Sequence, residues 1–353
     1  MSGARSRGPV AVTRRDLLKF GAAGVAGLTG ASVLELARGS SVLGANDARP
    51  NPEPSSPHTG MSHEGMGVVG ATVPDDRYDP RVFLTHFDYG RLESLPGGGT
   101  RRSWEIVAID REIEIAPGVF FPAWTYNGQV PGPTLRCTEG DLLRVDFINA
   151  GSHPHTIHFH GQHPPEMDGF EPIVRPGERF VYEFEAKPFG MHLYHCHTPP
   201  LKRHLHKGLY GVFIVDPPEG RPPANEMVMV MNAFDTNFDG ENEVYAVNTV
   251  AFCYNHIPID IPVRQPCRLY VANFTEFDLI NSFHLHAAMF RVLRTGTTLE
   301  SGELTDTLMM CQGERHILEF ELEHPGLHMF HAHQSEFAEL GWMGFFRGLE
   351  RMA

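Results

Sequence analysis

A single cysteine stands between two histidines in the segment MHLYHCHTPPLKRHLHKGLYG, residues 191–211. His195 precedes Cys196 and His197 follows it, and two further histidines, His204 and His206, lie within ten residues of the cysteine. Thiolate and imidazole groups are both good ligands for transition metals. A structural disulfide needs no imidazoles, and a structural zinc site usually contains a second thiolate or a simpler histidine pair. The segment therefore predicts a metal site of another kind.

Histidines also occur in four His-x-His pairs, which follow the same order in two halves of the chain. In a β-strand, residues i and i+2 point to the same face, so each pair directs two imidazoles toward one place. One metal ion cannot use eight imidazoles, whereas a cluster of two or three ions can. The pattern predicts a multinuclear cluster built by a duplicated domain. The pairs are His158/His160, His195/His197, His284/His286 and His331/His333.

Cys196 indicates the metal. A thiolate with two imidazoles and a weak or absent axial ligand forms a blue-copper electron-transfer site. We expect Cys196 to bind copper together with His155 and His204. His206 is the alternative to His204, and the spacing to Leu209 favours His204. Leu209 is expected at the axial position, where the lack of a donor atom should raise the reduction potential of the copper.

The backbone would connect the two kinds of site. Cys196 is expected to bind one copper through sulfur, while its neighbours His195 and His197 bind other coppers. The peptide bonds between them then form a short covalent path for electrons. Such adjacency predicts electron transfer from the thiolate-bound copper to the cluster.

Strands have to position these residues, because no long helical period is present. From about residue 100, apolar and polar residues alternate in segments such as RSWEIVAIDREIEIAPG, DLLRVDFINAG and HILEFELEHPG, with turns between them. We expect an all-β chain with two antiparallel Greek-key sandwiches. The first domain is predicted at 100–217, a proline-rich linker at 218–226 and the second domain at 227–353.

The N-terminal hundred residues have a different composition. TRRDLLKFGAAGVAGLTGASVL contains Arg14 and Arg15 before a short apolar run, which is typical of a twin-arginine signal peptide, predicted at 1–45. The apolar run is too short for a membrane span, and we expect export to the periplasm or the outside. Residues 46–99 are rich in Pro, Gly and Ser and predict a flexible linker and arm. Its HTGMSHEGMG segment is either a weak copper-binding tail or a linker with incidental histidines.

Charge and cysteine content limit the partners and the disulfide bonds that this chain can have. The formal net charge is −14, which argues against a nucleic-acid partner. Four cysteines besides Cys196 remain, and they could form one disulfide or stay as buried thiols. They are Cys137, Cys253, Cys267 and Cys311.

Taken together, the motifs resemble those of laccase-like two-domain multicopper oxidases, which are built from cupredoxin domains. FPAWTYNGQVPGPTLR resembles the family's first-domain opening, and HTIHFHG and HLYHCHT resemble its copper motifs. The resemblance covers about residues 100–350. It implies about four coppers per chain, one of type 1, one of type 2 and two of type 3, with dioxygen reduced to water at a trinuclear cluster.

The resemblance also assigns the ligands residue by residue. It implies that His155, Cys196 and His204 bind the type 1 copper, with Leu209 in the axial place. His158 and His284 match the type 2 ligands. The type 3 ligands are His160, His195, His197, His286, His331 and His333.

The second domain departs from a complete copper domain. Ala332 stands where a type 1 cysteine would be, and Asn281 and Phe337 stand where the two type 1 histidines would be. Only the first domain should therefore hold a type 1 copper. In the family this arrangement implies a homotrimer, with each cluster between a first and a second domain of neighbouring chains.

Two other functions fit parts of this pattern. Copper nitrite reductases also have two such domains, but they need three interface histidines rather than eight, and His158 stands where they carry a catalytic aspartate. A copper carrier would suit the His/Met segment, yet a carrier needs no multinuclear cluster. We therefore favour the oxidase.

The reductant and the proton donors are less defined. The electron should enter at His204, from a small phenol or from a metal ion such as Cu(I). The absence of a dense Met-rich insertion favours the phenol, for which an open apolar cleft is expected. Reduction of dioxygen consumes protons, and Asp168 and Glu336 are the first candidates to deliver them, ahead of Glu166 and Glu339.

Overall fold

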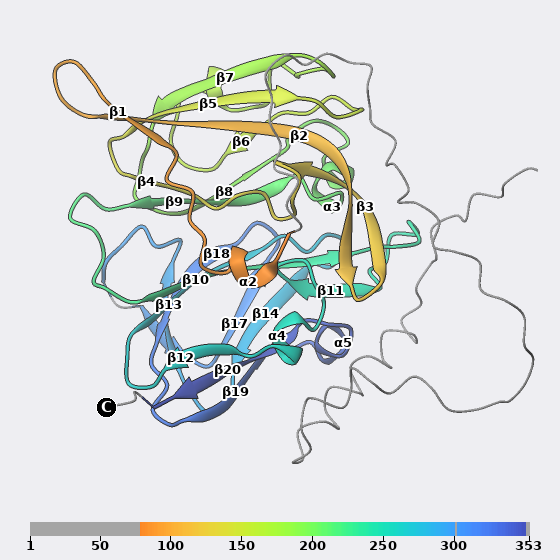
Figure 1. Cartoon of the computed structure of the whole chain (residues 1–353), viewed down its shortest axis with the longest axis vertical. Coiled ribbons are helices and arrows are strands. Elements are labelled where there is room, and N and C mark those ends of the chain that lie inside the picture. Colours follow the sequence, from red (N-terminus) through yellow and green to blue (C-terminus); the bar gives the residue numbers. More distant parts are fainter. Residues whose placement is uncertain (1–77, 301, 351–353) are drawn as a thin grey trace, which may run out of the picture.

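The computed structural model describes residues 78–300 and 302–350, which form two β-sandwich domains stacked on each other (Figure 1). The signal peptide predicted at 1–45 and the part of the linker before Tyr78 lie outside the described residues. The expected all-β class with two cupredoxin-like sandwiches is confirmed.

Domain 1 contains two sheets. The first has the order β1 (Arg91–Ser94), β2 (Thr100–Ala116), β5 (Leu142–Asn149) and β7 (Arg179–Glu185), and β3 (Val119–Tyr126) also pairs with β2. The second has the order β4 (Leu135–Thr138), β9 (Tyr210–Asp216), β8 (Gly190–His195) and β6 (His158–Phe159).

Domain 2 repeats this plan. Its first sheet has the order β11 (Val244–Val247), β10 (Asn225–Phe234), β13 (Cys267–Asn273), β18 (Arg315–Phe320), β15 (Phe290–Arg294) and β16 (Glu303–Thr305). Its second has the order β12 (Ile259–Pro262), β20 (Met343–Leu349), β19 (Gly326–His331), β14 (Ile280–Leu285) and β17 (Thr307–Cys311). The order β12-β20-β19-β14 therefore corresponds to β4-β9-β8-β6.

Only short helices interrupt the strands in the described part of the chain. They are α2 (Pro80–Phe83), the 3₁₀ helix η1 (Pro165–Met167), α3 (Leu201–His206), α4 (Cys253–His256) and α5 (Ser335–Glu339). Over the described residues, no helix has the length and apolarity required to cross a bilayer.

The sheets differ from the expected antiparallel sandwiches, because each of them contains one parallel pair. These pairs are β2 with β5, β4 with β9, β10 with β13, and β12 with β20. Alternation of apolar and polar residues reports which face of a strand is buried, and it does not report the direction of the neighbouring strand. The duplication is visible here too, since both domains place their parallel pairs alike.

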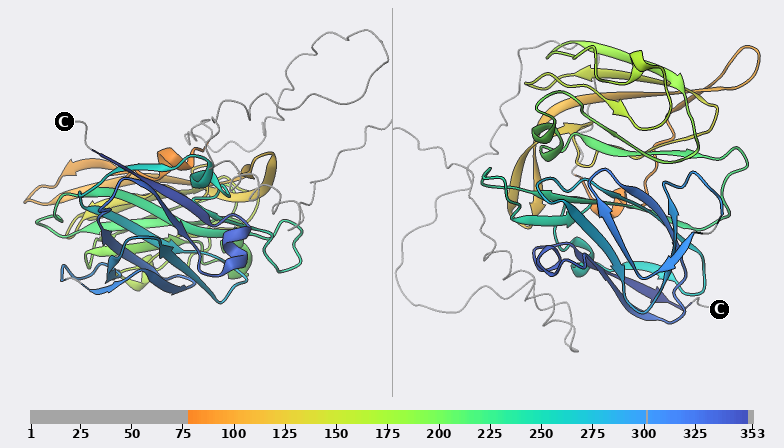
Figure 2. Two further views of the ribbon diagram at one scale, coloured as in Figure 1. Left: turned by 90° about the horizontal axis from the view of Figure 1, so that it is seen from below. Right: turned by 180° about the vertical axis from the view of Figure 1, so that it is seen from behind.

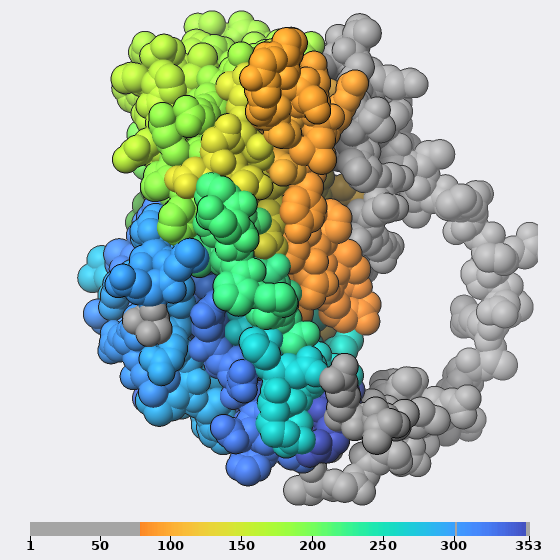
Figure 3. Space-filling view, turned by 90° about the vertical axis from the view of Figure 1, so that its left-hand side faces the viewer, coloured from red at the N-terminus to blue at the C-terminus, as the bar shows by residue number. Residues whose placement is uncertain are grey.

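The end of the predicted flexible arm, residues 78–99, is instead folded onto both domains (Figure 3). Phe83 and Leu84 are buried, and the Leu84 carbonyl accepts a hydrogen bond from the backbone N–H of Val228 at 2.8 Å. β1 pairs with β2 along its whole length. A few buried apolar side chains and a short strand suffice to order this segment, although its overall composition is that of a linker.

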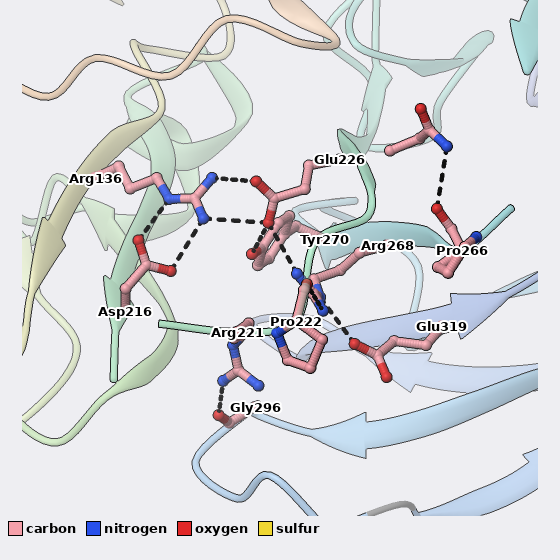
Figure 4. A network of polar contacts seen from close by, with 11 residues as sticks. Arg136, Asp216, Arg221, Pro222, Glu226, Pro266, Arg268, Tyr270, Gly296 and Glu319 are labelled. Atoms are coloured by element: carbon pink, nitrogen blue, oxygen red, sulfur yellow. Dashed lines mark hydrogen bonds and ion pairs between the residues drawn. The ribbon is translucent and has the colours of Figure 1, made fainter. Parts of the chain in front are cut away.

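The two domains share an apolar boundary and a buried ionic network. Met191, Leu193 and Val212 of domain 1 belong to the same hydrophobic cluster as the core of domain 2. Beside them, Arg136 of domain 1 donates hydrogen bonds to Asp216 and, across the boundary, to Glu226, each at 2.7 Å (Figure 4). The network continues through Glu226 to further residues of domain 2. The domains are therefore joined along a broad contact, as the view from behind also shows (Figure 2).

Candidate metal centres

A buried thiol and two imidazoles converge in domain 1. Cys196 directly follows β8, His204 lies in α3, and His155 precedes β6. The Nδ1 atom of His204 is 3.2 Å from both the Cys196 Sγ and the His155 Nδ1. All three side chains are buried, with exposed fractions of 0–3%. The sequence expectation of one Cys–His–His group is met in space, and we refer to it as the thiolate site.

Local structure explains how each ligand is held in place. The backbone of His155 exchanges two hydrogen bonds with Val174, at 3.0 and 3.2 Å. The backbone N–H of Thr156 points at the Cys196 sulfur at 3.4 Å, which would stabilise a thiolate. The Cys196 N–H donates to the Leu209 carbonyl at 3.0 Å, and the fully buried Leu209 belongs to the same core cluster as Cys196.

The donor chemistry of the thiolate site fits copper. Burial lowers the pKa of His155 to about 3 and that of His204 to about 4, so both rings are neutral and can bind a metal at ordinary pH. Burial raises the pKa of the Cys196 thiol, and a cation is what would bring it to the thiolate form. Two imidazoles and one sulfur, with leucine as the further neighbour, match a blue-copper ligand set.

The structure also separates His204 from its alternative. The Nε2 atom of His206 accepts a hydrogen bond from the backbone N–H of Asp235 at 3.0 Å. Its ring packs against Phe121 and Phe277 with centroid distances of 5.3 and 4.9 Å. His206 therefore has a structural role away from the sulfur.

Four histidines of domain 1 form a second group, the first half-site. His158 in β6 pairs directly with His195 in β8, and the Nε2 atoms of His160 and His195 are 3.1 Å apart. The His197 ring lies 5.5 Å from that of His158. Burial lowers the pKa values of His158, His160 and His195, which keeps these rings neutral.

Domain 2 forms the equivalent group, the second half-site. His284 in β14 pairs with His331 in β19, and the Nε2 atoms of His286 and His331 are 2.9 Å apart. The His333 ring lies 5.2 Å from that of His284. This group is more open than the first, because His286 and His333 are exposed.

Backbone carbonyls orient two rings of each half-site in the same way. In domain 1, His158 Nδ1–H donates to the Asp168 carbonyl at 2.7 Å and His195 Nδ1–H to the Cys196 carbonyl at 3.0 Å. In domain 2, the corresponding bonds run from His284 to the Asp306 carbonyl at 2.9 Å and from His331 to its neighbour Ala332 at 2.6 Å. A hydrogen bond at Nδ1 fixes the tautomer that leaves the Nε2 lone pair free for a metal. Both half-sites are therefore prepared to bind metal through Nε2.

The two half-sites do not meet within one chain. Among residues 78–300 and 302–350, each group of converging metal-binding side chains draws its histidines from one domain only. An open cavity of about 1420 Å³ lies in front of His158 and His160 and is bordered by Asp168 and Phe170. Each half-site thus offers its imidazoles outward.

The place of a type 1 site in domain 2 is filled by ordinary packing. Ala332 is fully buried in the core. The Asn281 side chain donates to Thr275 Oγ1 at 2.9 Å, and the Phe337 ring stacks on Tyr245 at 4.1 Å. These three side chains pack or hydrogen-bond within the domain and supply neither a thiolate nor an imidazole.

The predicted acidic residues are found in different surroundings. Asp168 lies beside the first half-site, with its Oδ1 3.3 Å from the His158 Nδ1. Glu336 lies exposed on α5, three residues after His333. Asp306 was not predicted, yet its Oδ1 is 4.0 Å from the His284 Nδ1 and its carbonyl orients that ring. Asp306 follows His284 by 22 residues whereas Asp168 follows His158 by 10, so the spacing did not reveal it.

All five cysteines are free thiols in the structure, including the four whose pairing was open. Cys137 and Cys267 are buried, Cys253 is half-buried and Cys311 is exposed. Disulfides therefore do not contribute to this fold within the described residues.

The chain is similar to known copper proteins. Two multicopper oxidase family models match residues 110–220 and 220–350. A solved structure described as a multicopper oxidase is 53% identical, with a TM-score of 0.76, and the match covers 77% of this chain and 97% of the other.

More distant relatives include enzymes of another activity. A copper-containing nitrite reductase of Neisseria gonorrhoeae is 27% identical over 239 residues, and the match covers 62% of this chain and 60% of the reductase. An L-ascorbate oxidase of Cucumis sativus is 42% identical over 106 residues, which cover 27% of this chain and 17% of that oxidase. With its two matched domains and a 53% identical solved oxidase that matches 77% of its length, this chain belongs to the multicopper oxidase family, whose cofactors are a type 1 copper and a trinuclear copper cluster.

Proposed function

We propose that this protein is a laccase-like oxidase, which takes single electrons from small phenolic reductants and reduces dioxygen to water. The observation that carries the proposal is the matched pair of half-sites, each with outward Nε2 atoms, next to one thiolate site. His155, Cys196 and His204 would hold the type 1 copper, and the eight paired histidines would hold the type 2 and type 3 coppers. When bound, these coppers accept electrons one at a time and deliver four of them to dioxygen.

The chain itself supplies a path for electrons from the thiolate site to the first half-site. Cys196 is joined by peptide bonds to His195 and His197, which both belong to the first half-site. The Cys196 carbonyl also accepts the hydrogen bond from His195 Nδ1. Covalent bonds and one hydrogen bond therefore run from the sulfur to the imidazoles. On the other side of the sulfur, His204 lies in α3, whose residues Lys202 and Arg203 are exposed.

Carboxylates beside the half-sites would hold the protons that water formation consumes. Asp168 borders the open cavity and is 44% exposed, so it can exchange protons with solvent. Asp306 lies in the corresponding place at the second half-site and is 55% exposed. We assign proton delivery first to Asp168 and Asp306, whose carboxylates lie 3.3 and 4.0 Å from half-site imidazoles.

A closed homotrimer would bring the half-sites together. The two half-sites lie on different domains and cannot form a cluster within one chain. In a head-to-tail ring of three copies, each first half-site would meet the second half-site of a neighbouring copy. Phe170 is 57% exposed, and its ring lies 6.1 Å from His197, which provides apolar surface for such a contact. About four coppers per chain would then be bound. Export by the twin-arginine route, to the periplasm or the outside, is proposed from the sequence.

Nitrite reduction is the second candidate, because the curated relatives with the longest matches include copper-containing nitrite reductases. The chain spans about 60% of the length of these relatives. The second half-site of this chain keeps two complete His-x-His pairs, more imidazoles than a single interface copper needs. This difference favours dioxygen over nitrite as the electron acceptor.

Oxygen uptake by the copper-loaded protein tests the proposal. We expect rapid uptake with 2,6-dimethoxyphenol, slower uptake with Cu(I), and no anaerobic turnover of nitrite. Uptake driven mainly by Cu(I) would identify a metal oxidase. Nitrite turnover without oxygen uptake, in protein that holds its full copper, would overturn the oxidase.

A further inference from the structure

A pocket of about 680 Å³ lies beside the thiolate site, between α3 and the loop that follows β10. Lys202, Arg203 and Lys207 line it on one side, and the rings of Phe238 and Phe277 line it on the other. An open apolar cleft was expected for a phenol donor. The pocket instead combines aromatic walls with three cations, in a chain whose formal net charge is −14.

The cations of this pocket face aromatic rings rather than acids. The Lys202 ammonium lies 4.3 Å from the centre of the Phe277 ring. The Lys207 ammonium lies 4.8 Å from the Phe121 ring and 5.1 Å from the Phe238 ring. In the described part of the chain, no carboxylate oxygen lies within ion-pair distance of Lys202, Arg203 or Lys207.

Lys207 is the most informative of the three. Its exposed fraction is only 9%, and burial lowers its pKa to about 8. The charge of Asp110 raises the pKa of Lys207 but forms no ion pair with it, so the buried ammonium is only partly compensated, and a bound anion would offset its lost hydration. A negatively charged group bound in the pocket would therefore stabilise the Lys207 ammonium.

The acids that line the pocket do not neutralise it. Asp235 turns its carboxylate into its own loop, where it accepts hydrogen bonds from the backbone N–H groups of Phe238 and Gly240 at 2.5 and 2.8 Å. Asp239 caps the tip of the same loop through the N–H of Glu241. The Nε2 atom of the neighbouring His206 accepts the hydrogen bond from the Asp235 N–H, and its ring packs against Phe277. The charge available to a ligand is positive.

The pocket is connected to the thiolate site through Trp124. The Arg203 guanidinium lies 5.1 Å from the centre of the Trp124 ring. That ring in turn lies 4.9 Å from His204 and 5.2 Å from His155. Arg203, which lines the pocket, thus lies against the same ring that packs on two copper ligands, so the pocket and the thiolate site are separated by few side chains.

We propose that this pocket binds anionic aromatic donors, namely phenols that carry a carboxylate, and that Lys202, Arg203 and Lys207 select them over neutral phenols. The inference rests on the proposed oxidase function and narrows its substrate class. The two phenylalanine rings would contact the donor ring, and the cations would bind its carboxylate.

Oxidation of these phenols balances with the reduction of dioxygen to water. Each donor loses one electron and the proton of its phenolic O–H bond and leaves as a phenoxyl radical. Four donors supply the four electrons and four protons that convert one dioxygen to two waters. The carboxylate takes no part in this chemistry and only positions the donor.

Two donors with the same ring test the selectivity. The copper-loaded full chain is assayed with 4-hydroxy-3,5-dimethoxybenzoate and with neutral 2,6-dimethoxyphenol. We expect Lys202→Gln and Arg203→Gln each to raise the KM for the benzoate roughly tenfold, as expected for loss of a charged contact, while the KM for the neutral phenol stays within about twofold. The exposed Arg91→Gln on β1 removes the same charge and should change neither value. Added salt should raise only the KM for the benzoate.

A binding measurement separates this inference from the oxidase proposal. Binding of 3,4,5-trimethoxybenzoate, which has no phenolic proton to lose, is measured by calorimetry on the copper-loaded full chain. We expect binding that Arg203→Gln weakens roughly tenfold and Arg91→Gln leaves unchanged. If this result is obtained while no donor drives oxygen uptake, the pocket still binds aromatic carboxylates but the oxidase proposal is wrong.

Three results would overturn the inference. One is equal KM values for the two donors in the wild type and in both pocket variants. Another is binding of the trimethoxybenzoate that does not depend on Arg203. In the third, the pocket variants slow reduction by an acidic electron-transfer protein but bind the small carboxylate like the wild type. The pocket would then be a protein docking surface.

Discussion

Imidazole rings are only useful as ligands when one particular nitrogen faces the metal. In both half-sites, backbone carbonyls fix the orientation by accepting a hydrogen bond from Nδ1–H. The Asp168 and Asp306 carbonyls accept from His158 and His284, and the carbonyls that follow His195 and His331 accept from those two rings. These bonds hold the rings in place before any metal binds, which reduces the entropy that metal binding has to overcome. The same two aspartates place a carboxylate next to each half-site.

Asp168 and Asp306 are expected to act in proton delivery. Asp168→Asn and Asp306→Asn keep the backbone carbonyl that orients the histidine but remove the ionisable oxygen. Each should lower kcat for oxygen reduction about tenfold to a hundredfold with copper content and blue absorption retained, because proton transfer at a positioned acid contributes on this order. Steady-state oxygen uptake and metal analysis would measure this.

Glu336→Gln is the matched control for these two variants, and it should change kcat by less than about twofold. The assignment is wrong if Glu336→Gln slows the enzyme as much as Asp168→Asn does and Asp306→Asn leaves it unaffected. A loss of copper in Asp306→Asn would also contradict it, since the carbonyl contact is unchanged.

His316 should make the copper-free protein sensitive to acid. Its ring is 2% exposed, neither nitrogen has a hydrogen-bond partner among the described residues, and burial lowers its pKa to about 4. The unfolded chain, with a histidine pKa of about 6.5, therefore binds the proton first as the pH falls. The stability that neutral His316 contributes is present above pH 6.5 and is lost as the pH falls toward 4, by about 1–2 kcal/mol between pH 7 and 5.

His316→Leu should remove this part of the acid sensitivity. Urea unfolding of copper-free protein at pH 7 and pH 5 would show a smaller loss of unfolding free energy in this variant than in the wild type. His256→Leu, at an exposed position, should leave the loss unchanged. Equal losses in the wild type and His316→Leu would refute the assignment.

At the scale of elements, the repeated sheets are what place the half-sites. In each domain the strand that carries the first pair lies beside the strand that carries the second, with His158 opposite His195 and His284 opposite His331. The next strand contributes a glycine beneath an aromatic ring, Gly344 in β20 below Phe330. The register of three neighbouring strands thus determines the geometry of the four imidazoles.

Gly344→Ala should disturb this register in domain 2. A Cβ at Gly344 would lie 2.5 Å from the Phe330 ring and 2.6 Å from the Tyr254 Cβ, and neither neighbour has room to move in the core. Overpacking of this size should lower the free energy of unfolding by about 2 kcal/mol. Denaturant unfolding measures it, and a loss below about 0.5 kcal/mol would mean that the sheet adapts freely.

The sequence was informative about the sheets and ligands because strand periodicity and histidine spacing are local signals. Cys196, His155 and His204 were predicted together from residue type and spacing, and they converge as expected. Asp306 was not predicted, because its contact with His284 depends on the pairing of β14 with β17 across a loop of unrelated length. The parallel pairs and the folded segment 78–99 were also missed, since both depend on contacts between distant parts of the chain.

At the scale of the whole molecule, the domains are firmly joined and their half-sites stay apart. The apolar boundary and the Arg136 network fix the domains in one relation, so a hinge movement that closes the two half-sites on each other would have to break buried ion pairs. Assembly of several copies is the route that leaves this boundary intact. We therefore expect each cluster to be shared between neighbouring chains and to reduce dioxygen there.

Complementation between two inactive variants tests this claim most directly. His160→Ala disables the first half-site and His286→Ala disables the second, so each protein alone should consume no oxygen with a phenolic donor. When the two chains are co-expressed and assemble at random, about one interface in four combines an intact first half-site with an intact second half-site of the neighbour. We predict oxygen uptake at about a quarter of the wild-type rate per chain. Mixed oligomers that bind copper but consume no oxygen would contradict a cluster shared between chains.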